Sequence, residues 1–285
     1  MTAKIAYQGE PGANSHIACL EARPDLEPMA CGTFEDSFQA VKEGEALLAM
    51  IPIDNSVAGR VADIHHLMPR SNLYIAGEHF LRVHHQLMIV PEADPQGLRT
   101  AHSHVHALGQ CRKVIRELKI KPVVAGDTAG AARELSESRD TTRAAIATAL
   151  AAEIYGLKII GRDIEDEEHN TTRFVLLSAT AQDAEPGAGP FVTSFVFRVR
   201  NVPAALYKAM GGFATNGVNM TKLESYQLEG QFSATQFYAD IDGHPSERNV
   251  RLALEELEFF CSHLRVLGVY KASPFRAELA KRMEG

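Results

Sequence analysis

The sequence predicts an α/β fold for the longer N-terminal part of the chain and an α+β fold for the C-terminal part. Short apolar runs alternate with helical patterns up to residue 177, which is typical of α/β proteins with mainly parallel sheets. A segment of small residues, Gly and Pro follows at 179–190. A second set of strands and helices comes after it. We therefore expect a first domain over 1–180, a linker over 181–190 and a second domain over 191–285.

The first domain is predicted to be built from strands that alternate with helices. In chain order, the apolar runs lie at 5–7, 47–51, 122–125 and 157–160. The helical patterns lie near 13–22, near 57–68, from Thr128 onward, and around Ile146, Leu150 and Ile154. The segment over 78–90 is interrupted by polar residues, and we expect it to cross between two lobes.

The second domain is predicted to have the order strand, helix, strand, strand, helix, strand. Apolar residues alternate over 191–199, which predicts a strand with one buried face. Two helix faces follow from the apolar spacing of Leu206, Met210 and Phe213 and of Val250, Leu254, Leu257 and Cys261. A hairpin is expected to turn at Glu229-Gly230, and the last strand at 264–270. This βαββαβ order is that of a ferredoxin-like domain.

The composition is that of a soluble globular protein, with 45% hydrophobic and 23% charged residues. The net charge of -7 and the lack of a basic stripe argue against a nucleic-acid partner. No apolar run approaches the roughly 20 residues that a membrane span needs, and we see no signal peptide. The four cysteines form no CxxC pair, so we expect reduced thiols in a cytoplasmic protein.

The segment 169–174, His-Asn-Thr-Thr-Arg-Phe, carries the most functional information. It lies between an acidic run at 163–168 and an apolar, strand-like run. Hydroxyl, amide and guanidinium groups all donate hydrogen bonds to carboxylate oxygens, and an arginine can do so with two parallel bonds. The segment therefore predicts a site for a small anion.

Three junctions between a strand and a helix carry cap-forming residues, and most of them also carry glycine. They lie at 8–15, 52–56 and 126–131. Helix N-termini bind anions through free amide groups, but the same residue types are also ordinary helix caps. Because ligands bind at the carboxyl ends of parallel strands, three junctions together with the Thr-Thr-Arg segment favour a binding site.

Other kinds of site have less support. His102, His104 and His106 would diverge on a helix but would share one face on a strand, so a metal site stays open. The adjacent pairs His65-His66 and His84-His85 have no helical ligand spacing, and we interpret them as surface residues or as supports of a site. No GxSxG, GxGxxG or GxxxxGK[ST] motif occurs. The remaining interpretation is an enzyme that acts on a small acid without a cofactor.

Taken together, these motifs resemble prephenate dehydratase with a C-terminal ACT regulatory domain. The matching blocks lie at 7–13, 51–56, 103–111, 127–132 and 170–174, and in the regulatory part at 204–207 and 217–225. The resemblance implies conversion of prephenate to phenylpyruvate in phenylalanine biosynthesis. It also implies a catalytic domain of two α/β lobes, similar to periplasmic binding proteins, with the site in the cleft.

The resemblance also implies roles for individual residues. Thr172 falls on the threonine of the family's Thr-Arg-Phe motif, and we expect its hydroxyl to donate a hydrogen bond to the departing oxygen. The residues expected to bind substrate are Asn55, Ser56, Ser103, Gln110, Thr128, Arg173 and Phe174. Alternatively, Arg173 forms a salt bridge to the acidic run at 165–168.

In the regulatory part, the resemblance implies a site for L-phenylalanine and a homodimer or homotetramer formed through ACT domains. The residues expected to bind the effector are Ala205, Leu206, Asn219, Leu223, Glu224 and Ser225. Over its whole length, the chain departs from the family pattern at four places: Asp54 stands for Glu, Val105-His106 for Pro-Gln, Ala204 for Gly, and Tyr226-Gln227 for Arg-Pro.

Three other functions remain open on the sequence. The first is an arogenate dehydratase, whose substrate differs by an amino group on the side chain. The second is a non-catalytic protein that binds an amino acid, because both domain types also serve binding elsewhere. The third is a metal-dependent lyase, which depends only on the three alternate histidines.

Overall fold

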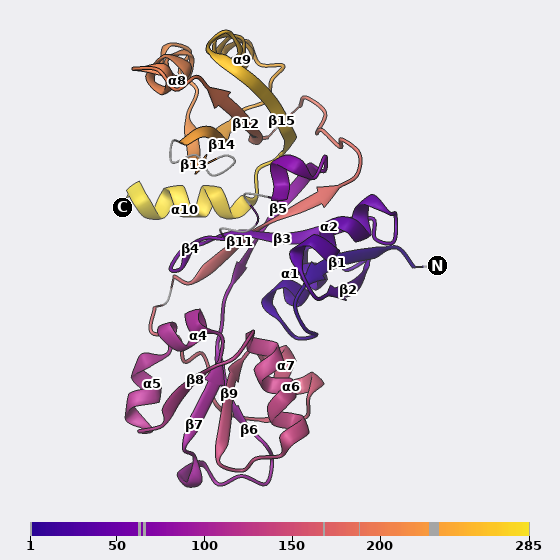
Figure 1. The fold of residues 1–285 in the computed structure, drawn as a ribbon, viewed down its shortest axis with the longest axis vertical. Coiled ribbons are helices and arrows are strands. Elements are labelled where there is room, and N and C mark those ends of the chain that lie inside the picture. The colour runs from indigo at the N-terminus through magenta and orange to yellow at the C-terminus, as the bar shows by residue number, and fades with distance from the viewer. Residues whose placement is uncertain are drawn as a thin grey trace. The chain divides into compact units, whose positions relative to one another are not determined.

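The computed structural model describes residues 2–61, 64, 67–167, 169–187, 189–227 and 234–284 (Figure 1). The expected turn at 229–230 and the pair His65-His66 lie outside the described residues. The chain divides into two compact units: Met1–Val61 with Phe80–Phe174, and Ala62–His79 with Val175–Gly285. No helix among the described residues has the length and apolar character needed to cross a membrane.

The first sheet has the strand order β2-β1-β3-β11-β5, and β4 pairs with β3. Its strands are β1 Lys4–Gln8, β2 Glu27–Cys31, β3 Leu48–Asn55, β4 Gly59–Arg60, β5 Tyr74–Arg82 and β11 Thr171–Ser178. The helices of this part are α1 Asn14–Ala22, α2 Phe34–Lys42 and the 3-10 turn η1 Met68–Arg70. β1 pairs in parallel with β2 and β3, as the alternating sequence pattern predicts.

The helix expected to start near residue 57 is wrong at its beginning. The chain instead turns back after β3, and β4 pairs antiparallel with it, with Asp54 opposite Arg60. Gly59 has a φ of 82°, a conformation that glycine adopts without steric cost and that a regular helix does not contain. This hairpin leaves Asn55 at the end of β3.

The second sheet has the order β10-β6-β9-β7-β8. Its strands are β6 Gln86–Ile89, β7 Thr100–Ser103, β8 Lys121–Val124, β9 Arg143–Ala147 and β10 Lys158–Gly161. The helices are α4 Val105–Gln110, α5 Arg112–Glu117, α6 Thr128–Ser138, α7 Ala149–Ile154 and the 3-10 turn η2 Pro95–Gly97. The chain passes from β5 to β6 through residues 83–85, so the expected crossover over 78–90 is confirmed.

The helical assignment of Ile146 is wrong, because Ile146 lies in β9 and only Leu150 and Ile154 lie in α7. β9 is a central strand between β6 and β7, and four of its five residues are buried. A continuous run of buried apolar residues does not distinguish a central strand from a buried helix.

The C-terminal part has one antiparallel sheet of order β13-β14-β12-β15. Its elements are β12 Phe191–Val199, α8 Ala205–Thr215, β13 Met220–Gln227, β14 Ala234–Asp242, α9 Arg248–Phe260, β15 Cys261–Lys271 and α10 Pro274–Glu284. Up to β15 the order is the predicted βαββαβ, although Cys261 opens β15 rather than closing the helix. Phe195 stacks on Phe213, which joins the sheet to α8. The predicted combination of an α/β and an α+β fold is confirmed.

Candidate active site

The candidate site lies in the first unit, where the chain crosses between the first sheet and the second sheet. One crossing is the segment 83–85, and the other is the segment 162–170 that precedes β11. The backbone N–H of Val83 donates to the carbonyl of Asn170 over 2.8 Å, which holds the two crossings together. Polar side chains from both sheets meet beside this bond.

The side chain of Asn55, the last residue of β3, is held in one orientation by the backbone of the turn that follows it. Its Oδ1 accepts hydrogen bonds from the backbone N–H groups of Val57 at 3.0 Å and Ala58 at 2.8 Å. The amide oxygen must therefore lie on that side, and Nδ2 on the other. From there Nδ2 donates to Asn170 Oδ1 at 2.8 Å and to Thr172 Oγ1 at 2.9 Å.

This arrangement fixes the role of the Thr172 hydroxyl. Both Asn55 Nδ2 hydrogens are donated, one of them to Thr172 Oγ1, so Oγ1 is an acceptor in that bond. The hydroxyl hydrogen of Thr172 is then free to donate elsewhere. No acceptor for it is recorded among the described residues. Thr172 is 9% exposed, so this donor is largely shielded from water.

The same chain of bonds continues to Gln110, at the end of α4. Because Asn170 Oδ1 accepts from Asn55, its Nδ2 is the donor to Gln110 Oε1, at 2.8 Å. His85 Nε2 contacts the same oxygen at 2.9 Å. The Gln110 carbonyl thus faces these two residues. Its amino group has no partner recorded across the described part of the chain and is available to an anion.

His85 is the last side chain in this series of hydrogen bonds. Its ring is 3% exposed, and its backbone N–H donates to Glu165 Oε2 over 2.9 Å. Burial lowers the pKa of His85, an effect only partly offset by its bond to Gln110 and by the charge of Glu165. The neutral ring is therefore favoured.

Ser56 holds the segment before β11 in place. Its Oγ donates to the carbonyl of His169 at 2.7 Å and accepts from the backbone N–H of Thr171 at 2.9 Å. Its own backbone N–H donates to the Thr171 carbonyl. These bonds fix the entrance of β11, the strand that carries Thr172.

Arg173 and Phe174 follow Thr172 in β11 and have different surroundings. Successive residues of a strand alternate between its faces, so Arg173 lies on the face opposite Thr172. Its Nη1 lies 4.0 Å from Asp54 Oδ2, which places the ion pair beside β3. Phe174 is 1% exposed in the packed interior. A substrate-binding role for these two residues stays a prediction.

The structure does not join Ser103 or Thr128 to the chain of bonds around Asn55. Ser103 ends β7, is fully buried, and donates to the Ile146 carbonyl at 2.6 Å. The next helix is capped by the side chain of His104. Thr128 is the first residue of α6, behind the cap residue Asp127, whose carboxylate accepts from Gly130.

The junction at 8–15 makes a packing contact with α7. A Cβ at Gly12 would lie 2.7 Å from the Cα of Ala151 in α7, so only glycine fits there. The Gly12 carbonyl accepts from the Thr148 hydroxyl, and the Pro11 carbonyl accepts from the Tyr155 hydroxyl. An anion site at this junction stays a prediction.

The metal interpretation of His102, His104 and His106 is also not supported. His102 contacts Thr100 and Arg143 through its two ring nitrogens, and His104 accepts from the backbone of His106. Among the described residues, the group with suitable ligand spacing is instead His84, Asp163 and Glu165. Glu165 also accepts from the backbone of His85, so its carboxylate supports the crossing segment.

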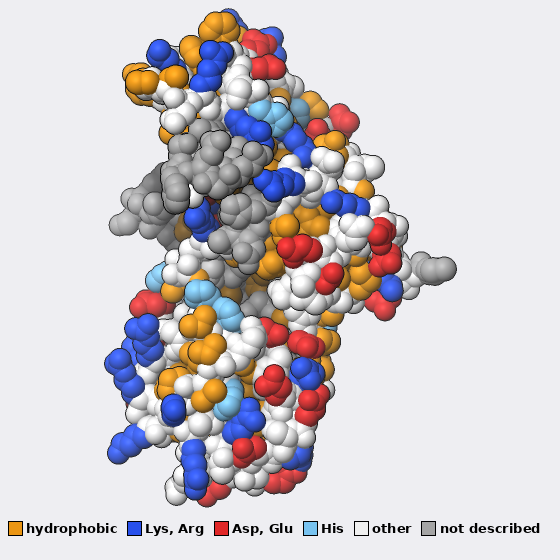
Figure 2. All heavy atoms as spheres, in the orientation of Figure 1, with side chains coloured by type: hydrophobic (Ala, Val, Ile, Leu, Met, Phe, Trp, Pro, Cys, Tyr) orange, Lys and Arg blue, Asp and Glu red, His pale blue; other side chains and the backbone are white. Residues whose placement is uncertain are grey.

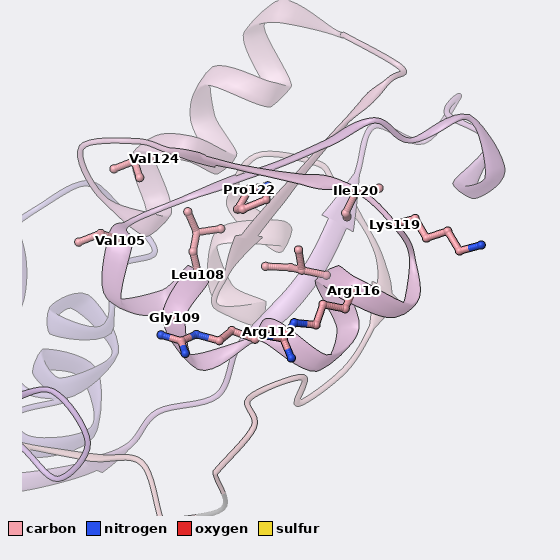
Figure 3. Close-up of a pocket in the computed structure, with 10 residues that line it drawn as sticks. Val105, Leu108, Gly109, Arg112, Arg116, Lys119, Ile120, Pro122 and Val124 are labelled. Atoms are coloured by element: carbon pink, nitrogen blue, oxygen red, sulfur yellow. The ribbon is translucent and has the colours of Figure 1, made fainter.

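A separate surface hollow of about 700 Å³ lies along α4, α5 and β8 (Figure 3). Apolar side chains such as Leu108 and Ile115 form its floor, and Arg112, Arg116 and Lys119 border it. In Figure 2, basic side chains gather at the lower left, over the region that holds α5 in Figure 1. The hollow contains none of the residues predicted for the site.

The predicted effector residues are spread over the start of α8 and the edge strand β13. Ala205 and Leu206 open α8 behind Ala204, whose φ is 60°. In β13, Leu223 and Ser225 are exposed, and Glu224 contacts Lys222 Nζ at 3.3 Å. Asn219 Nδ2 donates to Asp242 Oδ2 at 2.7 Å. A common ligand for these residues stays a prediction.

A family model described as prephenate dehydratase matches residues 5–182. The chain belongs to the prephenate dehydratase family. This family match confirms the resemblance that the motifs at Asn55, Gln110 and Thr172 predict. Sequence reasoning left His85 open as a surface or supporting residue and did not predict its bond to Gln110 or the bonds of Asn170, because neither residue stands at a spacing that marks it.

The chain is similar to relatives named as prephenate dehydratases and to relatives named as arogenate dehydratases. A bifunctional N-acyl-homoserine lactone acylase/prephenate dehydratase from Komagataeibacter europaeus is 51% identical, over 95% of this chain and 97% of that protein. An arogenate dehydratase/prephenate dehydratase from Arabidopsis thaliana is 36% identical, over 94% of this chain and 72% of that protein. The solved prephenate dehydratase of Arthrobacter aurescens in complex with L-Phe has a TM-score of 0.87 at 26% identity, covering 99% of this chain and all of that one.

Proposed function

We propose that the chain converts prephenate to phenylpyruvate, releasing water and carbon dioxide. The observation that carries this proposal is the bond from Asn55 Nδ2 to Thr172 Oγ1 at 2.9 Å, which leaves the Thr172 hydroxyl as a donor. The family match and the similarity to proteins named prephenate dehydratase support the same reaction class.

The reaction fits these donors. The bond between the ring carbon and the hydroxyl oxygen breaks while the ring carboxylate leaves as carbon dioxide, and its bonding electrons complete the aromatic ring. The departing oxygen gains negative charge and takes up a proton to leave as water. The Thr172 hydroxyl donates a hydrogen bond to this oxygen; a preorganised donor of this kind contributes roughly 3–4 kcal/mol to transition-state stabilisation.

Gln110 and Asn55 have different roles in this proposal. The free amino group of Gln110 binds a substrate carboxylate oxygen, since an amide N–H donates well to an anion. Asn55 holds Thr172 in place and need not touch the substrate. The test is formation of phenylpyruvate from prephenate by the wild-type chain and by Thr172→Ala. Equal turnover of the two proteins would contradict the assignment.

Arogenate is the competing substrate, because the relatives carry both names. The donors at Thr172 and Gln110 fit the ring hydroxyl and a carboxylate, which the two acids share. The comparison of kcat/KM for the two acids decides between them, and we propose that prephenate is preferred. A higher kcat/KM for arogenate would contradict that preference.

We also propose that L-phenylalanine regulates the enzyme through residues 191–285, as an ACT domain behind a catalytic domain over 1–180 and a linker over 181–190. The L-Phe complex of the Arthrobacter aurescens relative supports this role. We retain the homodimer or homotetramer formed through the ACT domains as part of this proposal. Calorimetric titration with L-phenylalanine tests binding, and light scattering tests the assembly.

Hydrolysis of N-acyl-homoserine lactones is a second candidate activity. It depends on the 51% identity to the relative whose name includes that acylase. Mass spectrometry would detect the free acid and homoserine lactone after incubation with such an amide. No release above that of boiled protein would remove this candidate.

A further inference from the structure

We propose that His85 is a positioning residue that holds the Gln110 carboxamide in one of its two flip states, so that the Gln110 amino group faces the substrate. This inference rests on the proposed dehydratase function, because it assigns a task to a side chain of the same site. The sequence predicts only that the pair His84-His85 lies on the surface or supports a site. The structure instead gives it a buried ring in contact with Gln110 Oε1.

The direction of each hydrogen bond follows from one fixed end. The backbone donors of Val57 and Ala58 fix Asn55 Oδ1 as an acceptor, so Asn55 Nδ2 is the donor to Asn170 Oδ1. The other end of the Asn170 amide must then donate to Gln110 Oε1. Gln110 Oε1 is therefore an acceptor, and the ring nitrogen that contacts it must carry hydrogen. His85 is thus protonated at Nε2.

The remaining ring nitrogen agrees with this tautomer. His85 Nδ1 is buried and has no hydrogen-bond partner in the described part of the chain. A bare nitrogen lone pair in that place costs less than an unpaired N–H or a charged ring, which a buried site penalises more strongly. Burial also lowers the pKa of His85, which favours the neutral ring.

A flip of Gln110 would reverse two bonds at once. Its amino group would then face the Asn170 amide N–H and the His85 N–H, and donors would oppose donors. Its carbonyl would turn to the substrate and repel a carboxylate. With His85 removed, Asn170 is the one remaining partner of Gln110 Oε1 among the described residues, and it alone opposes the flip there. His85 therefore acts on substrate binding through Gln110, without touching the substrate itself.

The kinetic test compares three variants. His85→Met removes the donor at similar volume, and we expect kcat/KM to fall about tenfold, the effect of one lost hydrogen bond, mainly through KM. His85→Gln can place an N–H near the former Nε2, and we expect it to stay within about threefold of the wild type. His106→Gln is the matched control, since His106 is exposed on α4, the helix of Gln110. Among the described residues, no bond joins His106 to Asn55, Asn170, Gln110 or His85. Normal kcat/KM in His85→Met would overturn the proposal.

A double-mutant cycle separates positioning from general damage to the fold. In a Gln110→Leu background, His85→Met should have no further effect on kcat/KM, because its target is gone. An undiminished further loss would show that His85 acts by another route and would overturn the proposal. Thermal unfolding of each variant shows whether the fold is intact.

A measurement without substrate keeps the inference distinct from the proposed function. In protein labelled with 15N-histidine, the signals lost in His85→Met should report a neutral ring with hydrogen on Nε2 at pH 7. Hydrogen on Nδ1 instead would overturn the positioning role even if prephenate is turned over. The expected tautomer, together with no turnover of prephenate or arogenate, would contradict the proposed function and leave the geometry of His85 and Gln110 supported.

Discussion

The polar chain, by which we mean the hydrogen-bonded side chains from Asn55 through Asn170 and Gln110 to His85, is partly or fully buried in the first unit. The strand β13, which carries predicted effector residues, is by contrast an edge strand with exposed side chains. From Asn55 to His85, each bond of the polar chain has a defined donor and acceptor, and the chain leaves two donors over. In β13, Leu223 and Ser225 lie exposed on an edge strand, and α8 begins behind a residue in a left-handed conformation. One chain therefore fixes the orientation of the donors predicted to bind substrate, whereas a common ligand for the predicted effector residues stays a prediction.

The largest expected effect is that of Thr172→Ala. It removes the donor to the departing oxygen, so kcat should fall by roughly 10²–10³-fold, as for loss of one transition-state donor. Thr172→Ser keeps the hydroxyl and should retain most of the activity. Steady-state kinetics on prephenate measures both. A Thr172→Ala variant with the wild-type kcat would contradict the proposed donation from Thr172 to the departing oxygen.

Asn55→Asp should reverse the direction of the polar chain. A carboxylate at this position accepts only, so the Thr172 hydroxyl would donate to it instead of to the substrate. We expect a loss of about 10²-fold in kcat, smaller than or similar to that of Thr172→Ala. Asn55→Asp changes few atoms, so circular dichroism should report an unchanged fold. Wild-type kinetics would show that the bond direction does not matter.

Sequence patterns predicted the members of the site better than their arrangement. The family resemblance implied Asn55, Gln110 and Thr172, and the structure links the three through hydrogen bonds that include Asn170, while their roles stay a prediction. The motifs did not identify His85, which lies 25 residues from its partner Gln110 in an adjacent histidine pair that no periodicity marks. Bond direction also could not be predicted, since it depends on the backbone donors that Asn55 meets after the turn.

Two errors in the fold have different causes. The residues after Asn55 have helix-like spacing, but the positive φ of Gly59 directs the chain into a hairpin. Ile146 fits a helix face by spacing, yet tertiary burial between two strands decides its state. The first error therefore has a local conformational cause, whereas the second arises where contacts distant in sequence override a local preference.

Ala204→Gly should stabilise the C-terminal part by about 1 kcal/mol, the approximate cost of placing a Cβ in the left-handed region. Ala204 has a φ of 60°, at the position where the family resemblance has glycine. Chemical denaturation measures the gain. The kcat on prephenate should not change, because the polar chain lies in the first unit. Unchanged or lower stability would show that the α8 start is not strained.

Mild acid should weaken the first unit before the C-terminal part. Burial lowers the pKa of His16, His85, His102 and His104 from the ordinary value of 6.5, and all four lie in the first unit. The unfolded chain then binds more protons than the folded one below pH 6.5, so stability falls as the pH drops through that value. Around His85, this balance includes Glu165, Gln110 and His84.

Hydrogen exchange at pH 7 and pH 5.5 measures this effect element by element. The amides of β6 and β7 should lose protection on acidification, while those of β12 and β14 should change less. His85→Gln should reduce the loss in β6, because it removes one of the four groups. Equal loss of protection in both parts would contradict the expectation that acid weakens the first unit more than the C-terminal part.

The first and second sheets differ in when their strands become available during synthesis of the chain. The second sheet uses only residues 86–161, an uninterrupted stretch that can assemble as soon as it leaves the exit tunnel. The first sheet begins with residue 4 but is completed by β11, which ends at Ser178. Its early strands must wait for a late one, because a nascent chain cannot pair with a strand that has not been synthesised. The second sheet can therefore form before the first sheet is complete. Thr172 is synthesised after Asn55, His85 and Gln110, which are other residues of its candidate site.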